Sequence, residues 1–330
     1  MSENNERMEA LRAWLAGCLD SESFVLAPAS ADASFRRYFR VRDGERTLIV
    51  MDAPPGKEDC RPFIAVARAF GDAGLNVPEI LASDVEHGFL LLSDLGDRQY
   101  LQVLDEASAD ALYGDAIDAL LRLQKAGLHD EATLPPYDEA LLMKEMDLFR
   151  DWYVEGYLGV SLDERQAQLL EQAFSMLAAS ALEQPRVWVH RDYHSRNLMV
   201  VSEHNPGILD FQDAVYGPLC YDLVSLLRDC YIAWPAARVD AWMRDYFTRA
   251  SPLGLLEGAG LDQFRRWFDW MGMQRHFKAI GIFARLYLRD GKPGYLGDIP
   301  RTMNYVLESA ARYGEFRGLR DFLTHLPRSP

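Results

Sequence analysis

The stretch that decides the fold is HRDYHSRN at residues 190–197, which follows the apolar run RVWV at 186–189. A second motif, ILDFQD at residues 208–213, comes shortly after it. The apolar run predicts a short buried strand, and the polar loop after it is the kind of segment that holds side chains rigidly towards a cleft. We therefore expect the chemistry of this chain to lie in these two motifs.

Three oxygen-bearing side chains in the two motifs suit phosphoryl transfer from Mg-ATP. That reaction needs a carboxylate to orient and deprotonate the acceptor hydroxyl, and oxygen ligands for the magnesium that neutralises the phosphates. We predict Asp192 as the catalytic base, Asn197 and Asp210 as Mg²⁺ ligands, and His190 as a support of the loop. The alternative is that these residues are only turn and cap residues between short strands.

The first hundred residues predict a small sheet with one internal helix. An amphipathic helix is expected over residues 7–20, and the strands FRRYFRV and TLIVM are joined by an Asp43-Gly44 turn. A helix is expected over residues 61–74 and ends at Gly74. Two further strands, VPEILASD and GFLLLSDLG, complete this region. We place the end of a β-rich, nucleotide-binding N-terminal lobe at residue 96.

After residue 96 the apolar spacing becomes mainly helical. Long amphipathic patterns cover residues 103–127, 138–157 and 162–183, and the pattern is helical again from Leu219 onward. The short strands RVWV, LMVV and GILD lie between them. The chain thus predicts an α+β architecture in two lobes, 1–96 and 97–330, with the catalytic loop and the acceptor site in the second lobe.

Composition excludes several classes of protein. The 330 residues carry a formal net charge of −15, which disfavours nucleic acid as a partner, although magnesium can offset the charge of a bound nucleotide. The N-terminus MSENNERMEA lacks the features of a secretory signal, and no apolar run approaches a membrane span. The four cysteines form no zinc pattern. We expect a cytoplasmic protein with no membrane partner and no obligate protein partner.

The two motifs resemble the aminoglycoside phosphotransferase/choline kinase branch of the kinase-like superfamily. The catalytic loop of that branch reads H-x-D-x-H-x-x-N, and a D-F-x-D motif follows it. The resemblance implies a two-lobed protein-kinase-like fold that uses ATP and Mg²⁺, with His194 near the transferred phosphoryl group or the acceptor. The segment YGPLCYDL at 216–223 resembles the G-D-P-x-x-D-L segment of the branch. That match implies that Asp222 is buried and braces the catalytic loop.

The N-terminal lobe departs from this branch. The expected glycine-bearing loop reads ASADAS at 29–34, and Met51 and Phe63 stand where a strand Lys and a helix Glu are expected. Another cation must then hold the phosphates, and the sequence leaves four candidates: Arg36, Arg37, Arg40 and Lys57. The nucleotide contacts that we predict are Ser30, Ser34, Arg36, Leu92, Asp94 and Leu95. The missing pair also leaves open a non-catalytic, nucleotide-binding pseudokinase.

The segment 273–301 resembles the bacterial N-acetylmuramate/N-acetylglucosamine kinases of peptidoglycan recycling, as does most of the chain. The resemblance implies transfer of the ATP γ-phosphate to the C1 hydroxyl of an N-acetylated amino sugar. On a helix, Arg275, Lys278, Arg285 and Arg289 fall along one stripe that could bind an acceptor carboxylate, or that is only a solvated face. The acceptor-binding residues that we predict are Asp213, Arg275, His276, Lys278 and Arg285. An aminoglycoside or choline-type kinase is the alternative.

Overall fold

The computed structural model describes residues 3–21, 23–30 and 35–327. These residues form two compact units: the first is Met1–Gln99 with Leu198–Asp213, and the second is Tyr100–Asn197 with Ala214–Pro330. The DFQD motif therefore belongs to the first unit and the HRDYHSRN loop to the second. The lobe boundary expected at residue 96 stays a prediction.

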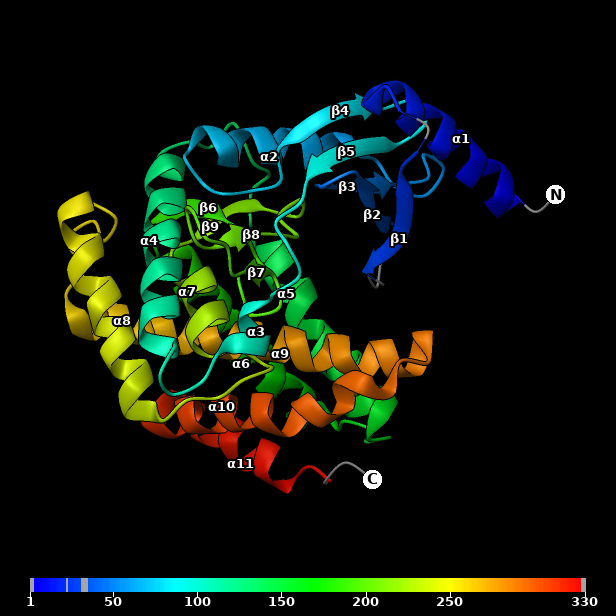
Figure 1. Cartoon of the computed structure of the whole chain (residues 1–330). Helices are drawn as coiled ribbons and strands as arrows, with labels where there is room; N and C mark the ends of the chain where they lie inside the picture. The colour runs from blue at the N-terminus through cyan, green and yellow to red at the C-terminus, as the bar shows by residue number, and fades with distance from the viewer. Residues whose placement is uncertain (1–2, 22, 31–34, 328–330) are drawn as a thin grey trace. The chain divides into compact units, whose positions relative to one another are not determined.

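The first unit is built on a five-stranded antiparallel sheet with the order β1-β2-β3-β5-β4 (Figure 1). Its strands and helices, in chain order, are α1 (Glu3–Leu19), β1 (Val25–Ser30), β2 (Arg37–Asp43), β3 (Arg46–Asp52), α2 (Arg61–Asp72), β4 (Ile80–Asp84), β5 (Phe89–Ser93), β7 (Leu198–Met199) and β8 (Gly207–Ile208). Gly44 has a φ of 60° in the turn that joins β2 to β3, which agrees with the hairpin predicted at Asp43-Gly44.

Two aromatic and aliphatic clusters hold this unit together. Helix α1 contributes Leu11 and Leu15 to a buried core with Val41, Val50 and Leu91 from β2, β3 and β5. Helix α2 places Phe63 and Phe70 against Phe211 of the DFQD motif, with ring centroids 4.8 Å and 5.9 Å apart. Packing of α2 thus fixes the segment that carries Asp210.

The second unit is mainly helical. Its elements are α3 (Tyr100–Val103), α4 (Ala109–Gly127), α5 (Glu139–Leu148), η1 (Phe149–Tyr157), α6 (Glu164–Leu182), β6 (Arg186–Val189), β9 (Val215–Pro218), α7 (Cys220–Leu227), α8 (Ala236–Ala250), η2 (Ser251–Leu253), α9 (Leu261–Asp290), η3 (Pro293–Asp298), α10 (Ile299–Arg312), η4 (Gly314–Phe316) and α11 (Arg317–His325). With the β-rich first unit they confirm the α+β class.

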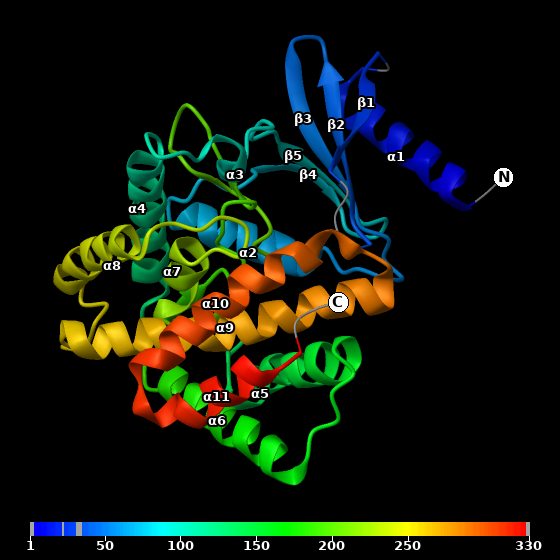
Figure 2. The ribbon, with the colours of Figure 1, turned by 90° about the horizontal axis from the view of Figure 1, so that it is seen from below.

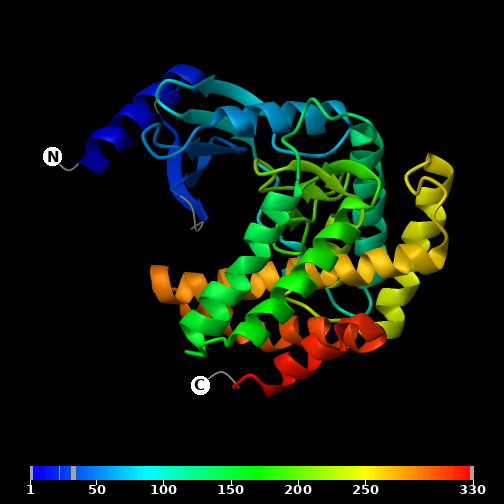
Figure 3. The same ribbon diagram turned by 180° about the vertical axis from the view of Figure 1, so that it is seen from behind.

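Helix α9 is the axis of the second unit. It runs beside α10 in Figure 2, and Figure 3 shows α5 and α6 crossing its other side. Most residues between Phe264 and Leu286 are buried, so this helix is surrounded by protein on nearly all sides. The backbone of Leu148 lies close to Gly281. A Cβ atom added to Gly281 would be 2.3 Å from the carbonyl carbon of Leu148. The close approach of α5 and α9 therefore depends on glycine.

Two expected helices differ in detail from the structure. The pattern over 103–127 contains a break, because the Asp105 carboxylate accepts hydrogen bonds from the backbone N–H groups of Ala107 and Ser108 and forms a turn between α3 and α4. The pattern over 138–157 is continuous but changes at Phe149 from α-helix to the wider π-helix η1. The 3.6-residue spacing of apolar residues predicts helix but reveals neither a short break nor a change to a wider helix.

None of the helices within the described ranges has both the length and the apolar character needed to cross a membrane.

Candidate active site

The loop that carries Asp192 is fixed by a carboxylate of α7. Asp222 accepts hydrogen bonds from the backbone N–H of His190 at 2.6 Å and from that of Arg191 at 2.9 Å. Arg191 has a φ of 77°, a left-handed conformation that costs a residue with a side chain about 1–3 kcal/mol and persists only where its surroundings impose it. Asp222 supplies part of that restraint immediately before Asp192.

Asp192 lies among positive charges. Burial raises its pKa, but the positive charges of Lys278, His194, Arg275 and Arg191 act in the opposite direction and bring the pKa below its ordinary value. The side chain is therefore a carboxylate at neutral pH. This is the form that a base for an acceptor hydroxyl must have.

His194 is buried, and its environment favours the neutral imidazole. Burial lowers its pKa, although Asp229 and Asp192 act against this effect. Its Nδ1 atom has no hydrogen-bond partner among the described residues, and its ring packs edge-on against Tyr231 with centroids 5.2 Å apart. Asp229 also accepts hydrogen bonds from the N–H and hydroxyl of Ser195, at 2.9 Å and 2.5 Å. Asp229 is thus a second carboxylate that braces the loop, and no sequence pattern indicated it.

The two residues expected to bind magnesium belong to different units. Asn197 donates its side-chain N–H to the backbone carbonyl of Asp192 at 3.0 Å, so its amide oxygen is the atom that would act as a metal ligand. Asp210 follows β8 with a φ of 64°, and its Oδ1 accepts a hydrogen bond from Gln212 at 2.8 Å. Within the described ranges no three His, Cys, Asp or Glu side chains gather around a possible metal position. Convergence of Asn197 and Asp210 on one ion remains a prediction.

A buried carboxylate that no sequence pattern indicated lies beside the HRDYHSRN loop. Glu145 of α5 forms ion pairs with Arg191 and, at 3.0 Å, with Lys278. It also accepts hydrogen bonds from Tyr137 and, at 3.2 Å, from Gln274. Because Glu145 lies on an ordinary amphipathic helix pattern, its spacing gave no signal of this role.

The expected basic stripe of α9 is divided by burial. Arg275 and Lys278 are buried, with relative exposures of 5% and 9%, whereas Arg289 is exposed and pairs with Asp290. Lys278 donates to the hydroxyl of Tyr221 at 3.0 Å. Arg275 is hydrogen-bonded only weakly, to Cys230 Sγ at 3.5 Å, and its Nε has no partner within the described part of the chain. The inner half of the stripe therefore belongs to the interior of the second unit.

The remaining predicted acceptor residues occupy separate positions. The His276 ring is buried, its Nε2 lies 2.9 Å from the carbonyl oxygen of Arg228, and it stacks on Tyr305. Arg285 is half-buried on α9, and Asp213 is exposed in the first unit. Their contact with an acceptor stays a prediction.

In the first unit, the four candidate cations have different partners. Arg37 pairs with the buried Asp52, which Arg7 of α1 also contacts at 2.6 Å. Arg40 pairs with Asp94 at 2.7 Å and donates to the Gly96 carbonyl. Lys57 lies 4.8 Å from the centre of the exposed Phe35 ring.

Arg36 is the fourth candidate, and it lies on the approach to β2. Its Nε and Nη2 are both 3.4 Å from one oxygen of Glu58, and its charge also interacts with Tyr38 and Asp213. Met51 is buried and pairs with Tyr38 across β2 and β3. Arg36 itself directly precedes β2, two positions before Tyr38.

The other predicted nucleotide contacts are placed as follows. Leu92 is a buried residue of β5 that pairs with Ile49 and Ile80. Asp94 and Leu95 follow the end of that strand. Ser30 is the last residue of β1, whereas Ser34 lies outside the described residues.

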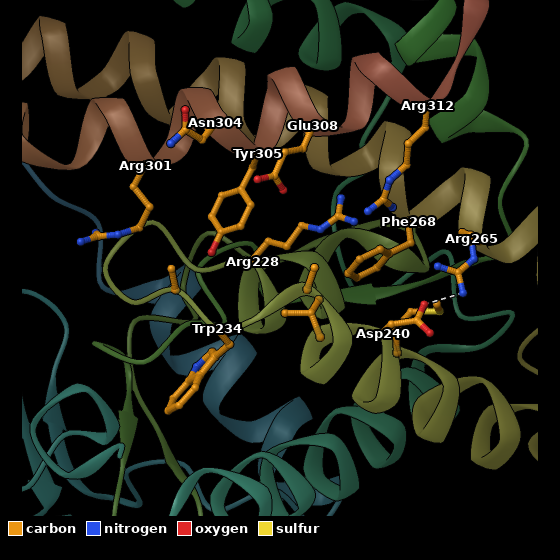
Figure 4. A pocket seen from close by; sticks show the side chains of 14 residues that line it. Arg228, Trp234, Asp240, Arg265, Phe268, Arg301, Asn304, Tyr305, Glu308 and Arg312 are labelled. Carbon is orange, nitrogen blue, oxygen red and sulfur yellow. Dashed lines mark ion pairs between the residues drawn. The ribbon is translucent and has the colours of Figure 1, made fainter. Parts of the chain in front are cut away.

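A cavity of about 200 Å³ lies elsewhere in the second unit, between α8, α9 and α10 (Figure 4). Its lining includes Arg228, Arg265, Arg301 and Arg312 but none of the residues predicted from the sequence to form the site. These cations are already neutralised by carboxylates: Arg228 and Arg312 by Asp269, Arg265 by Asp240 and Arg301 by Asp298.

Comparison with known proteins decides the family. Residues 25–260 match the phosphotransferase enzyme family. The chain belongs to this family. It is 49% identical to the N-acetylmuramate/N-acetylglucosamine kinase of Pseudomonas aeruginosa, over 98% of both chains. It is 45% identical to the protein of the same name from Pseudomonas putida, over 99% of this chain and 98% of that one.

A solved structure supports the fold of this phosphotransferase. Aminoglycoside phosphotransferase APH(4)-Ia, in a ternary complex with AMP-PNP and hygromycin B, superposes with a TM-score of 0.59. The match covers 92% of this chain and 99% of that one at 17% identity. The phosphotransferase thus has the kinase-like fold that the motifs predicted.

Proposed function

We propose that this phosphotransferase transfers the γ-phosphate of ATP to the anomeric C1 hydroxyl of N-acetylmuramate, N-acetylglucosamine or both. The observation that carries the proposal is the braced loop that holds an ionised Asp192, in a chain closely similar to kinases named for these two sugars. Such a reaction would serve the recycling of cell-wall sugars and would take place in the cytoplasm.

In this mechanism Asp192 orients the C1 hydroxyl and takes its proton. An anomeric hydroxyl is more acidic than an ordinary alcohol, so a carboxylate whose pKa is not raised suffices as the base. The neutral imidazole of His194 lies two residues further along the loop and would contact the transferred phosphoryl group or the acceptor. His190, whose Nδ1 accepts from the Asp192 N–H at 3.2 Å, and Asp222 would hold the loop in place.

Asn197 and Asp210 would hold Mg²⁺ together with phosphate oxygens of ATP, and the ion would neutralise the negative charge of those phosphates. The donor types fit this metal, because both residues offer oxygen atoms and the amide N–H of Asn197 is turned towards the Asp192 carbonyl. The phosphates of the nucleotide would supply further oxygen ligands. Ser30, Ser34, Leu92, Asp94 and Leu95 remain the proposed contacts to the rest of the nucleotide.

For the missing strand lysine we propose Arg36 as the replacement. The guanidinium groups of Arg37 and Arg40 each have a close carboxylate partner, at up to 2.7 Å. The guanidinium of Arg36 lies 3.4 Å from Glu58 and also interacts with Tyr38. Its charge interaction with Asp213, the last residue of the DFQD motif, places Arg36 near the segment that carries Asp210.

For the acceptor we propose Arg275 as the principal cation, assisted by Lys278 and Arg285, with Asp213 and His276 as further contacts. The guanidinium of Arg275 is buried and makes one weak hydrogen bond, so it has donors left for an anionic group of the acceptor. The lactyl carboxylate of N-acetylmuramate would supply it.

Two other functions predict different results. An aminoglycoside or choline-type kinase would share the fold and the loop, but the two Pseudomonas relatives are named as kinases of N-acetylmuramate and N-acetylglucosamine. A non-catalytic pseudokinase would bind nucleotide without turnover, and the absent strand lysine is the feature in its favour.

The deciding experiment couples ADP release to a panel of acceptors. We expect turnover with N-acetylmuramate or N-acetylglucosamine and none with kanamycin or choline. Asp192→Asn should lower kcat by about 10²–10⁴-fold and leave MgATP binding intact. Phosphorylation of kanamycin or choline alone would overturn the substrate assignment, and an unchanged rate in Asp192→Asn would overturn the mechanism.

A further inference from the structure

Glu145 gathers four donors from three parts of the second unit. Arg191 comes from the catalytic loop, Gln274 and Lys278 from α9, and Tyr137 from the segment before α5. Glu145 itself has a relative exposure of 5%. Four donors match the lone-pair positions of one carboxylate, so its hydrogen-bonding capacity is filled.

We propose that Glu145 is a positioning residue for Asp192 and acts through Arg191. The inference rests on the proposed function, because it assigns Asp192 as the base. Glu145 itself touches no reacting atom. It holds the side chain of the residue that immediately precedes the base.

The backbone of Arg191 shows why such a restraint is needed. Its φ of 77° is unfavourable for arginine and must be imposed by the surroundings. Asp222 of α7 holds its N–H at 2.9 Å, while Glu145 of α5 holds its guanidinium. Backbone and side chain are thus fixed from two different helices. If either contact to Arg191 is lost, the loop gains access to other conformations, in which Asp192 is displaced.

Helix α9 completes the arrangement. Gln274 and Lys278 are one helical turn apart and therefore share a face of α9. Both contact Glu145, at 3.2 Å and 3.0 Å. Loss of the Glu145 charge would leave the half-buried Arg191 and the buried Lys278 without this partner, and an uncompensated buried charge is strongly destabilising.

The same unit contains a matched control in Asp269. This carboxylate is also fully buried, and it binds Arg228 and Arg312 as well as the hydroxyl of Tyr313 at 2.9 Å. It lies on α9, like Gln274 and Lys278, and its partners Arg228, Arg312 and Tyr313 all lie outside the HRDYHSRN loop. A variant at Asp269 therefore measures what loss of a buried ion cluster does to stability alone.

The experiment compares Glu145→Gln with Asp269→Asn, with N-acetylmuramate and N-acetylglucosamine as acceptors. We expect both variants to have a lower melting temperature. Below that temperature, Glu145→Gln should lower kcat by about 10- to 100-fold. Its KM for ATP should stay within about threefold of wild type, because nucleotide binding is retained while the base is misplaced. Asp269→Asn should keep the wild-type kcat. Equal kcat values in the two variants would overturn the proposal.

A double-mutant cycle tests the route through Arg191. In an Arg191→Met background, Glu145→Gln should change kcat by less than about twofold, because the contact is already lost. If the two losses multiply, Glu145 does not act through Arg191, and the proposal is wrong.

Tyr137→Phe covers the case in which Glu145→Gln does not fold. It removes one donor to Glu145 without a change of charge, and it should lower kcat severalfold; an unchanged kcat would contradict the proposal. The wild-type rate on the two sugars tests the proposed function separately, since the inference depends only on the ratio of variant to wild type.

Discussion

Asp222 Oδ2 lies 2.6 Å from the backbone nitrogen of His190, although the two residues are 32 positions apart in the chain. Burial raises the pKa of Asp222 to about 7, while the N–H groups of His190 and Arg191 favour its ionised form. The carboxylate is fully enclosed in the first turn of α7. It therefore links that helix directly to the backbone that precedes Asp192.

Asp222→Asn should weaken both the fold and the catalytic loop. Asparagine has one acceptor oxygen, so one of the two N–H groups would face an amide NH₂ and remain buried without a partner. We expect the free energy of unfolding to fall by about 1–3 kcal/mol and kcat to fall with it. Urea denaturation and steady-state kinetics measure the two effects.

Ser225→Ala is the control for this prediction. Ser225 lies one turn further along α7, is equally buried, and its hydroxyl has no hydrogen-bond partner among the residues described. Its removal should leave stability and kcat close to wild type. Wild-type stability in Asp222→Asn would show that the two N–H groups do not depend on this carboxylate.

Arg36→Met should raise the KM for ATP by about tenfold or more, because a charge-assisted contact to phosphate contributes about 1.5–3 kcal/mol. The KM for the sugar should change little. Lys57→Met is the control, since Lys57 lies over the exposed Phe35 ring. An unchanged KM for ATP in Arg36→Met would show that another group replaces the strand lysine.

Two glycines of α9 predict opposite outcomes for the same substitution. At Gly281 an added Cβ would lie 2.3 Å from the backbone of Leu148, which cannot move without shifting α5. At Gly272 the nearest atom is the side-chain Nη1 of Arg228 at 3.2 Å, which would have to move by only a few tenths of an ångström. We expect Gly281→Ala to destabilise the protein by about 1–3 kcal/mol or more. Gly272→Ala should be near neutral, because alanine favours a helix interior by about 1 kcal/mol over glycine. Thermal unfolding of both variants checks the difference.

The sequence was most informative where the residues of the candidate site are close together in the chain. His190, Asp192 and Asn197 lie within one loop, and the strand before them is a continuous apolar run, so both the motif and its secondary structure could be predicted from spacing. The same holds for the Asp43-Gly44 turn, whose residue types determine the turn geometry. The two-lobed α+β fold followed from the change of apolar period near residue 96.

The sequence was least informative where the candidate site depends on contacts between residues that are far apart in the chain. Glu145 lies 46 positions before Arg191, and on a helix pattern a glutamate normally indicates a solvated face. Arg275 and Lys278 likewise fell on a plausible surface stripe, because a helical wheel shows which residues share a face but not what covers that face. Asp229 was passed over for the same reason: its partner Ser195 is 34 positions away.

His276 predicts how stability depends on pH. Burial is the main reason that its pKa is lowered to about 3, and the nearby charge of Arg275 adds to this effect. In the unfolded chain the pKa of histidine is about 6.5, so the unfolded state binds a proton that the folded state rejects as the pH falls below that value. The stabilisation is therefore fully present above about pH 6.5 and is lost progressively towards pH 3, at up to about 1.4 kcal/mol per pH unit.

His276→Gln isolates this contribution. Glutamine can keep a donor near the Arg228 carbonyl, which lies 2.9 Å from His276 Nε2, but it does not titrate. Between about pH 7.5 and about pH 5, wild type should lose about 2 kcal/mol more of its unfolding free energy than the variant. Urea denaturation at the two pH values measures the difference, and His204→Gln, at an exposed position, should behave like wild type. Parallel losses in wild type and His276→Gln would mean that the buried imidazole accepts a proton in the folded state.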